Sequence, residues 1–514
     1  MNKQKFSEAT LLLIVFGLFN LFASGHWTVA VATWIAPIFA LRYLTVSQQR
    51  RKFARFFLVY WITLSIPWYG GTPIFGAAHF IFMAVNTLIA VIPYAVYQWL
   101  APRLRRNAST EQGRSGRLPF IATLIFPLAG TTSEFLLSSA SPIGNFGAAG
   151  YSQYGLPVLT QLTAVTGMLG LTFLLAWFPA VINWAWENEF NWARVRAGVA
   201  TFAVVLLAVI GYGAVRLATA PEIGTQETVR VASFTLVETH MGDLNTLLEE
   251  EGVDAYRQAT QSVHAQYLQM TETAVADGAN IILWPELAIT GVAEDVQATI
   301  EKGQALAQEA GVYLAMPVFI TYPDSDRTWE NKLYVAGPDG RIIIEHVKYG
   351  GNLLEGTLKG SGEIEVVETP YGNLAGIICW DTNYPTIVSQ IGRQKTDILL
   401  SPSKEWDGIN PMHAEMAVFR AIENGAAVIR QTDEGLSIVV DGYGRTLATG
   451  EGLVADGNYL LVDVPTSSPT TIYPVVGDAI GVVAAAGLVV LAIYALLASR
   501  RQRQEMVETA VAMS

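Results

Sequence analysis

Three polar residues of this chain each follow an apolar run that is typical of a buried strand. They are Glu286, Lys348 and Cys379, and they follow the runs 281–285, 341–347 and 374–378. The carboxyl ends of strands in α/β folds are where side chains converge on a cleft. We therefore expect the carboxylate, the amine and the thiol to lie close together.

These residue types form a chemically sensible set for acyl transfer. A thiol attacks a carbonyl group as its thiolate, and Glu286 is suited to take the thiol proton as a general base. Lys348 is suited to favour the thiolate and to stabilise a tetrahedral oxyanion. The product would be a thioester on Cys379, which an amine or water then attacks.

Each residue also has a plainer interpretation. Cys379 fits a buried, unreactive thiol, Lys348 fits a solvated strand end, and Glu286 fits a carboxylate at a helix entry, where the helix dipole favours it. A thiol activated by histidine is the rival mechanism. The candidate histidines are His240, His264, His346 and His413. None of them lies in a recognisable Cys–His motif, so the sequence favours the Glu–Lys–Cys set.

The composition sets these residues in an unusually apolar chain. The 514 residues are 51% hydrophobic and 15% charged, with a mean hydropathy of +0.34. These values argue strongly against a wholly soluble or disordered protein. The net charge of −12 argues against binding of nucleic acid, which needs basic residues for the phosphates. Cys379 is the one cysteine, which excludes an intrachain disulfide and any cysteine-rich metal site.

Apolar runs long enough for membrane spans fill both ends of the sequence. We predict eight spans, because about 20 apolar residues cross a hydrocarbon core. They are 9–24, 27–46, 56–71, 74–100, 118–138, 159–186, 198–218 and 474–498. The first run is also compatible with a signal peptide, but no typical cleavage site follows it. Glu134 lies inside the fifth span, where an ionisable residue is usually functional.

The basic residues of the short loops predict the orientation of these spans. Lys and Arg cluster at 3–5, 50–55, 103–117, 194–196 and 500–503, whereas the loops near 25, near 72 and at 139–158 contain none. Basic loops stay in the cytoplasm. Both termini are therefore expected to be cytoplasmic, and 219–473 is expected to lie outside the cytoplasm.

The segment between the last two spans has the pattern of a globular domain. Strand-like and helix-like stretches alternate first and strands pair later, which predicts a layered α/β sandwich. The predicted organisation is seven transmembrane helices in 1–220, a catalytic domain in 228–465, a transmembrane helix in 474–498 and a cytoplasmic tail in 499–514.

Two short motifs make the resemblance to a known family specific. Trp-Pro-Glu at 284–286 and Ile-Ile-Cys-Trp-Asp at 377–381, with Lys348 between them, resemble the Glu–Lys–Cys triad of the nitrilase, or carbon–nitrogen hydrolase, superfamily. The fold of that superfamily is an α-β-β-α sandwich. The arrangement of spans around this domain resembles the apolipoprotein N-acyltransferase family. Further similar stretches lie at 132–136, 150–153, 413–423 and 435–444.

The resemblance implies a reaction, partners and a location. Such enzymes take an acyl chain from a membrane phospholipid, usually phosphatidylethanolamine, and hold it as a cysteine thioester. They transfer it to the N-terminal amine of a diacylglyceryl-cysteine lipoprotein. The protein would lie in the bacterial inner membrane with its catalytic domain on the periplasmic side. No cofactor or metal is implied.

The resemblance also assigns supporting residues, and here the chain diverges. Glu355 would take the role of a second glutamate that supports Lys348 and the oxyanion, although the surrounding loop is altered. Residues expected to bind substrate are Glu134, Trp380, Asp381 and Trp406. Trp380 and Asp381 replace a Tyr-Glu pair, only Trp406 is kept from a motif at 402–406, and Asp433 replaces an asparagine.

Two other classes of function stay open at this point. A membrane-tethered amidase or amide-forming enzyme would use the same triad on a different substrate, and the altered loop after Lys348 keeps it open. A transporter or receptor is compatible with eight spans, but the sequence lacks the repeated halves that are typical of transporters.

Overall fold

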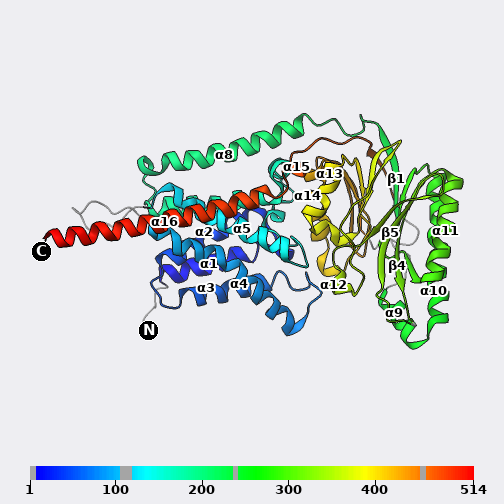
Figure 1. Ribbon diagram of the computed structural model, residues 1–514, viewed down its shortest axis with the longest axis horizontal. Coiled ribbons are helices and arrows are strands. Elements are labelled where there is room, and N and C mark those ends of the chain that lie inside the picture. The colour runs from blue at the N-terminus through cyan, green and yellow to red at the C-terminus, as the bar shows by residue number, and fades with distance from the viewer. Residues whose placement is uncertain (1–6, 105–117, 235–240, 324, 452–458, 514) are drawn as a thin grey trace, which may run out of the picture. The chain divides into compact units, whose positions relative to one another are not determined.

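The computed structural model describes the chain except for residues 1–6, 105–117, 235–240, 324, 452–458 and 514 (Figure 1). The chain divides into two compact units. One unit comprises 1–139, 147–215 and 478–514, and the other comprises 140–146 and 216–477. His240 lies outside the described residues.

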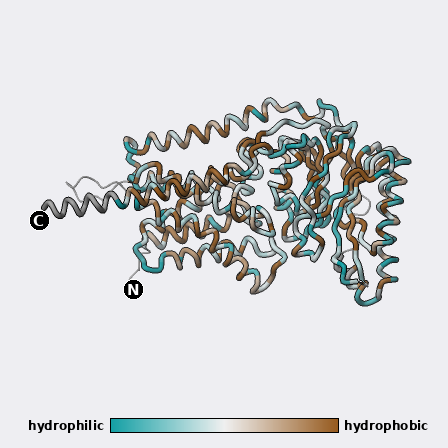
Figure 2. The backbone as a smooth tube through the Cα atoms, viewed as in Figure 1, coloured by the Kyte–Doolittle hydropathy of each residue, from teal (hydrophilic) through white to brown (hydrophobic). Residues whose placement is uncertain are grey.

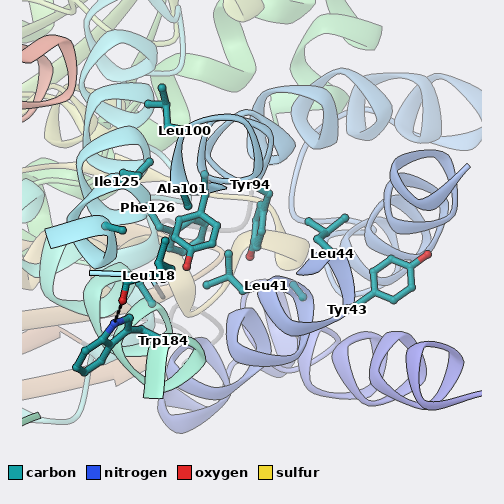
Figure 3. Packing of buried hydrophobic residues seen from close by; sticks show 14 of the residues in the cluster. Leu41, Tyr43, Leu44, Tyr94, Leu100, Ala101, Leu118, Ile125, Phe126 and Trp184 are labelled. Carbon is teal, nitrogen blue, oxygen red and sulfur yellow. Dashed lines mark hydrogen bonds between the residues drawn. The ribbon is translucent and has the colours of Figure 1, made fainter. Parts of the chain in front are cut away.

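The first unit is built from apolar helices. They are α1 (Glu8–Asn20), α2 (Ala30–Val46), α3 (Lys52–Ser65), α4 (Gly76–Leu100), α5 (Ile125–Ala140), α6 (Pro157–Thr160), α7 (Thr163–Glu187), α8 (Trp192–Ala218) and α16 (Ala479–Met513). Figure 2 shows their predominantly hydrophobic colour. Aromatic rings fill the core between these helices. Tyr94 packs on Phe126, with ring centroids 4.8 Å apart (Figure 3). It also packs on Phe56, with ring centroids 4.9 Å apart.

Five helical stretches of the described residues are long and apolar enough to cross a membrane. They are Gly76–Leu104, Phe120–Ala140, Thr163–Glu187, Trp192–Ala218 and Ala479–Arg500. These stretches indicate a multi-pass membrane protein. The first three predicted spans correspond instead to α1, α2 and α3, which have 13, 17 and 14 residues. At about 1.5 Å per residue such helices are shorter than a hydrocarbon core of about 30 Å.

The second unit contains two mixed sheets. In the first sheet the strand order is β15-β1-β2-β4-β5-β6, and β3 pairs with β4. Its strands are β1 (Thr228–Phe234), β2 (Ile281–Leu283), β3 (Ile289–Val292), β4 (Tyr313–Thr321), β5 (Glu330–Ala336), β6 (Ile342–Val347) and β15 (Tyr459–Pro465). Parallel pairs join β1, β2 and β4, and antiparallel pairs extend the sheet on both sides.

The second sheet has the order β14-β13-β11-β9-β8-β7. Its strands are β7 (Val366–Thr369), β8 (Gly372–Gly376), β9 (Ile398–Leu400), β11 (Ala427–Arg430), β13 (Leu436–Val440) and β14 (Thr446–Glu451). A separate pair is formed by β10 (Ser403–Lys404) and β12 (Thr432–Asp433). This pairing places Ser403 opposite Thr432 and Lys404 opposite Asp433. The residue before β10, Pro402, accepts a hydrogen bond from the N–H of Cys379, which follows β8.

The alternation of side chains along the strands produces the layers. In β1, Val229 and Val231 belong to the core shared with the second sheet. Ala232 and Phe234 belong to the core under α10 (Val253–Ala276) and α11 (Ala293–Ala310). Successive side chains of a strand point to opposite faces, so the sheet is covered on both sides.

Two further helices lie on the second sheet. They are α13 (Pro385–Arg393) and α14 (Met412–Asn424), and α14 contacts β11 and β13. The unit is thus a nitrilase-like α/β sandwich with two inner sheets and helices outside, as the sequence predicted. Its short helices are α9 (Met241–Glu250), α12 (Asn352–Glu355) and α15 (Tyr473–Val476).

Candidate active site

Glu286 follows β2 and is almost completely buried. One carboxylate oxygen accepts hydrogen bonds from Lys348 Nζ at 2.6 Å and from Asn331 Nδ2 at 2.8 Å. The other oxygen accepts one from the backbone N–H of Lys404 at 2.8 Å. A buried charge needs such partners to offset the loss of hydration. These three donors hold the carboxylate in one orientation.

Lys348 follows β6 and is 1% exposed, which is unusual for a lysine. Its ammonium group lies between the carboxylates of Glu286 and Glu355. Burial opposes its positive charge, but the two carboxylates outweigh burial and raise the pKa of Lys348 above its usual value. The two carboxylates therefore favour the protonated form of Lys348.

Glu355 ends the short helix α12 and keeps a third of its side chain exposed. It contacts Lys348 through one oxygen, and the other oxygen lies 3.5 Å from Asn331 Nδ2. The structure thus brings Glu355 to Lys348 despite the altered loop. Because it is partly exposed, Glu355 borders the solvent side of the buried Glu286–Lys348 pair.

Cys379 lies in a sharp turn between β8 and the 3-10 helix Cys379–Asn383. Its φ angle of +43° is in a region that side chains other than glycine rarely adopt, and such strain is typical of functional sites. Its backbone N–H donates to the carbonyl of Pro402 at 2.9 Å, and its thiol donates to the carbonyl of Lys404 at 3.5 Å. The turn aims a buried thiol at a fixed acceptor.

The surroundings of the thiol keep it protonated. Burial, reinforced by the Glu286 carboxylate, raises the pKa of Cys379 well above its usual value. The positive charges of Lys348 and Arg430 act in the opposite direction without cancelling this rise. The charges of Glu286 and Lys348 thus act on the thiol, and Glu286 and the thiol both bond the backbone of Lys404.

Asp381 is completely buried and connects the lysine segment to the cysteine turn. One oxygen accepts from the backbone N–H groups of Tyr349 and Gly350 at 2.9 and 2.7 Å. The other accepts from the N–H of Ile378 at 3.0 Å and pairs with His346 Nε2 at 2.7 Å. With both oxygens used by protein groups, Asp381 positions the site, whereas the sequence led us to expect a substrate contact.

An aromatic cluster lies next to the cysteine. Trp380 and Trp406 stack with ring centroids 6.2 Å apart, and Trp380 also packs on Phe146 and His413, each at 5.0 Å. Trp380 is 6% exposed. Phe146 comes from the short segment 140–146, which belongs to this unit although it follows α5 in the sequence. The two expected tryptophans are thus brought together beside Cys379.

Buried charged side chains contact the backbone of the cysteine turn and one another. Arg430 donates to the carbonyl of Cys379 at 3.4 Å and to Glu405 Oε1 at 2.6 Å. His413 Nδ1 lies 3.2 Å from the same Glu405 oxygen. Burial and the Arg430 charge lower the pKa of His413 to about 4, so its imidazole is neutral near pH 7.

The other histidines are used by structural contacts. His346 pairs with Asp381, and His264 bonds the carbonyl of Thr290 and the hydroxyl of Thr299. The rival mechanism with a histidine base therefore gains no support from the described residues. The described residues also contain no group of three or more His, Cys, Asp or Glu that could hold a metal ion.

Glu134 belongs to the helical unit. Its carboxylate accepts hydrogen bonds from the hydroxyl of Thr172 at 2.7 Å and from the N–H of Ala149 at 3.3 Å. These contacts connect α5 to α7 and to the 3-10 helix Ala149–Gln153. They give the carboxylate a structural role inside this unit.

Sequence reasoning missed Asn331 and Lys404 as site residues. It assigned no role to Arg430, although Arg430 follows the pattern of the apolipoprotein N-acyltransferase family. Asn331 lies near the start of β5, and a polar residue at the start of a strand is unremarkable. Lys404 contacts the site through its backbone, and any residue type could make these contacts, so the sequence does not reveal them. Arg430 ends an otherwise apolar strand, as the three predicted residues do, and that signal was available.

The comparisons with known proteins agree with this geometry. Residues 253–468 match the carbon–nitrogen hydrolase family. The chain is similar to the apolipoprotein N-acyltransferases of Brucella melitensis (30% identity, 58% of this chain and 59% of that protein) and Bradyrhizobium diazoefficiens (28% identity, 74% of each). The match thus spans about three fifths of the Brucella protein's length.

One further relative and one solved structure are also similar to this chain. The apolipoprotein N-acyltransferase of Pasteurella multocida is 24% identical over 81% of this chain and 78% of its own. An amidase from Nesterenkonia sp. is 20% identical, with a TM-score of 0.35, over 48% of this chain and 95% of its own. The three acyltransferases and the match of residues 253–468 confirm the resemblance stated from the sequence.

Proposed function

We propose that this chain, a relative of the apolipoprotein N-acyltransferases with a carbon–nitrogen hydrolase domain, is a membrane acyltransferase that carries its acyl group on Cys379. The observation that supports it most is the buried Lys348 ammonium held between Glu286 and Glu355, within electrostatic reach of a thiol in a strained turn. A buried lysine fixed by two carboxylates is costly for stability, and acyl transfer supplies a reason for it.

In the first half-reaction the thiol attacks the ester carbonyl of a phospholipid. Glu286 takes the thiol proton while the new carbon–sulfur bond forms, and Lys348 stabilises the negative charge on the carbonyl oxygen. Collapse of the tetrahedral intermediate breaks the carbon–oxygen ester bond. Glu286 returns the proton to the leaving alkoxide, so a lysophospholipid departs and a neutral thioester stays on Cys379.

In the second half-reaction an amine attacks the thioester. Glu286 accepts the proton that the amine loses as the carbon–nitrogen bond forms, and the carbon–sulfur bond breaks. The proton then returns to the cysteine sulfur. The amide leaves, and the enzyme is restored with a protonated thiol.

The similarity to apolipoprotein N-acyltransferases and the long apolar helices support the substrates and the location that we propose. The donor is a phospholipid, phosphatidylethanolamine by preference, and the acceptor is the N-terminal amine of a diacylglyceryl-cysteine lipoprotein. The five long apolar helices, together with the shorter α1, α2 and α3, anchor the chain in a bacterial inner membrane with cytoplasmic termini. In the sequence, the domain 228–465 lies between the spans of 1–220 and the span 474–498, and it acts outside the cytoplasm. Residues 499–514 form a cytoplasmic tail.

The test is to trap the thioester. The purified full chain in detergent is incubated with phosphatidylethanolamine that carries a labelled acyl chain. We expect label on the wild-type protein that hydroxylamine releases, and none on Cys379→Ser. A melting curve shows whether the variant is folded. Absence of label from the folded wild type with several phospholipids would reject the proposal, and turnover of small amides instead would support an amidase.

A further inference from the structure

The backbone of Lys404 touches two members of the candidate triad. Its N–H donates to Glu286 Oε2 at 2.8 Å, and its carbonyl accepts from the Cys379 thiol at 3.5 Å. Glu286 and Cys379 both bond the backbone of Lys404, so a small rotation or shift of this residue moves both contacts. The relative placement of the base and the nucleophile therefore depends on where Lys404 is held.

The secondary structure around Lys404 is too short to hold it firmly. The strand β10 has two residues, and it pairs with the equally short β12, where Lys404 is opposite Asp433. Backbone bonds to β12 and its neighbours connect Ser403 to Gln431 at 2.7 Å and Glu405 to Asp433 at 3.0 Å. A two-residue strand pair is marginal without side-chain contacts.

The Lys404 side chain supplies the missing contact. Its ammonium group lies 2.5 Å from Asp433 Oδ2 and 3.5 Å from Glu434 Oε1. Asp433 is 3% exposed, and burial raises its pKa although the Lys404 charge opposes that rise. Charge-assisted hydrogen bonds in such surroundings are stronger and more directional than neutral ones.

We infer that Lys404 is a positioning residue whose ion pair with Asp433 holds the peptide that aligns Glu286 with the Cys379 thiol. The inference rests on the proposed thioester chemistry and deepens it. The ammonium group takes no part in the reaction: Lys404 acts through its N–H and carbonyl, and its side chain only fixes their position. Reaction rates fall about 100-fold for misplacements of about 1 Å.

The chain offers a closely matched control. Lys332 has a side chain that is 16% exposed, compared with 17% for Lys404, and it also pairs with two carboxylates, Glu330 at 2.6 Å and Glu345 at 3.3 Å. Loss of Lys332 therefore removes a similar ion pair elsewhere in the same sandwich. Any effect that both substitutions share is one of general stability.

The test compares four single variants of the full chain in detergent: Lys404→Met, Lys404→Arg, Asp433→Asn and Lys332→Met. Two rates are measured, alkylation of Cys379 by iodoacetamide and acylation by labelled phosphatidylethanolamine. We expect Lys404→Met and Asp433→Asn to slow both by about 10- to 100-fold, with the half-saturating lipid concentration unchanged. Both rates of Lys404→Arg should lie within about threefold of the wild-type rates, since arginine also pairs with a carboxylate. Both rates of Lys332→Met should match those of the wild type.

Each outcome decides the inference. Wild-type rates in a folded Lys404→Met protein, or equal slowing by Lys332→Met, would overturn it. If Lys404→Met does not fold, Asp433→Asn, which keeps the side-chain size, decides in the same way. Failure of the proposed function is distinguishable: the wild type would then react with iodoacetamide but take no acyl group from phospholipid.

Discussion

At the scale of single residues, the candidate site contains a thiol that is protonated at rest. Burial and the Glu286 carboxylate raise the pKa of Cys379, and neither Lys348 nor Arg430 reverses the shift. A stable thiolate, of the kind found in cysteine–histidine pairs, is therefore not expected here. The proton must leave as the carbon–sulfur bond forms, and this assigns the base a direct part in the rate.

Replacement of the base should consequently slow acylation strongly. We expect Glu286→Gln to lower the acylation rate by about 10²- to 10⁴-fold, the usual contribution of a positioned general base. Glu345→Gln is the control, because Glu345 is half exposed and pairs with Lys332. Single-turnover labelling at neutral pH measures both, and a rate above a tenth of wild type in Glu286→Gln would remove the assignment.

His413 predicts a specific dependence of stability on pH. Its pKa falls from about 6.5 in the unfolded chain to about 4 in the fold, so the stability it contributes is complete above pH 6.5. That stability is lost as the pH drops from 6.5 towards 4. One pKa unit corresponds to about 1.4 kcal/mol, which gives a loss of roughly 2 kcal/mol at pH 5.

Urea titrations at pH 7 and pH 5 test this expectation. The drop in the free energy of unfolding of His413→Gln should be smaller than that of the wild type by roughly 2 kcal/mol. The exposed His26→Gln is the control and should show the wild-type drop. An unchanged drop in His413→Gln would show that His413 is not held neutral.

At the scale of elements, Asp381 connects the end of β6 to the cysteine turn. It bonds the N–H groups of Tyr349 and Gly350 after β6 and the N–H of Ile378 before the turn. The two sheets of the sandwich thus meet at one carboxylate. This contact fixes the distance between the lysine segment and the nucleophile segment.

Loss of the Asp381 charge should therefore affect both stability and reactivity. Asp381→Asn replaces one accepting oxygen by a donor, and we expect a loss of about 3 kcal/mol, the upper value for a charged hydrogen bond. Urea titration measures it, with the exposed Asp407→Asn as the control. A loss below about 1 kcal/mol would mean that the contact carries little of the site's rigidity.

The elements also show which parts of the site sequence can predict. Glu286, Lys348 and Cys379 were predictable because each follows an apolar run, and the carboxyl ends of strands in α/β folds are where side chains converge on a cleft. Asn331 and Lys404 were not, because they reach Glu286 over 45 and 118 residues of sequence. Their contacts depend on the order of strands and on β10, whose two residues have no periodicity that could reveal a strand.

At the scale of the whole molecule, the low fraction of charged residues is an average over two units of different composition. The helical unit contains the five long apolar helices of the described residues, and the other unit is an α/β sandwich with its polar groups paired at one site. The eight predicted spans include three helices of 13 to 17 residues. Hydropathy alone could not predict where those helices end, because turns interrupt apolar runs without changing their composition.

The single cysteine makes the predicted orientation directly testable. In a Cys379→Ser background, new cysteines are placed at the exposed Ser262 of α10 and the exposed Gln48 after α2. A maleimide that does not cross membranes should label Ser262→Cys in cells with a permeabilised outer membrane. Gln48→Cys should react only after the inner membrane is opened. The reverse pattern would contradict the proposed orientation.

The central claim is that one cysteine passes an acyl chain from lipid to amine, and a pulse and chase measures this most directly. Full-length protein is first acylated by labelled phosphatidylethanolamine, freed of lipid, and then mixed with a diacylglyceryl-cysteine peptide. Our account predicts that label leaves Cys379 and appears in a hydroxylamine-stable amide at the peptide's N-terminus, and that an N-acetylated peptide receives none. Label that stays on the protein, or leaves only as free fatty acid in the presence of the peptide, would contradict it.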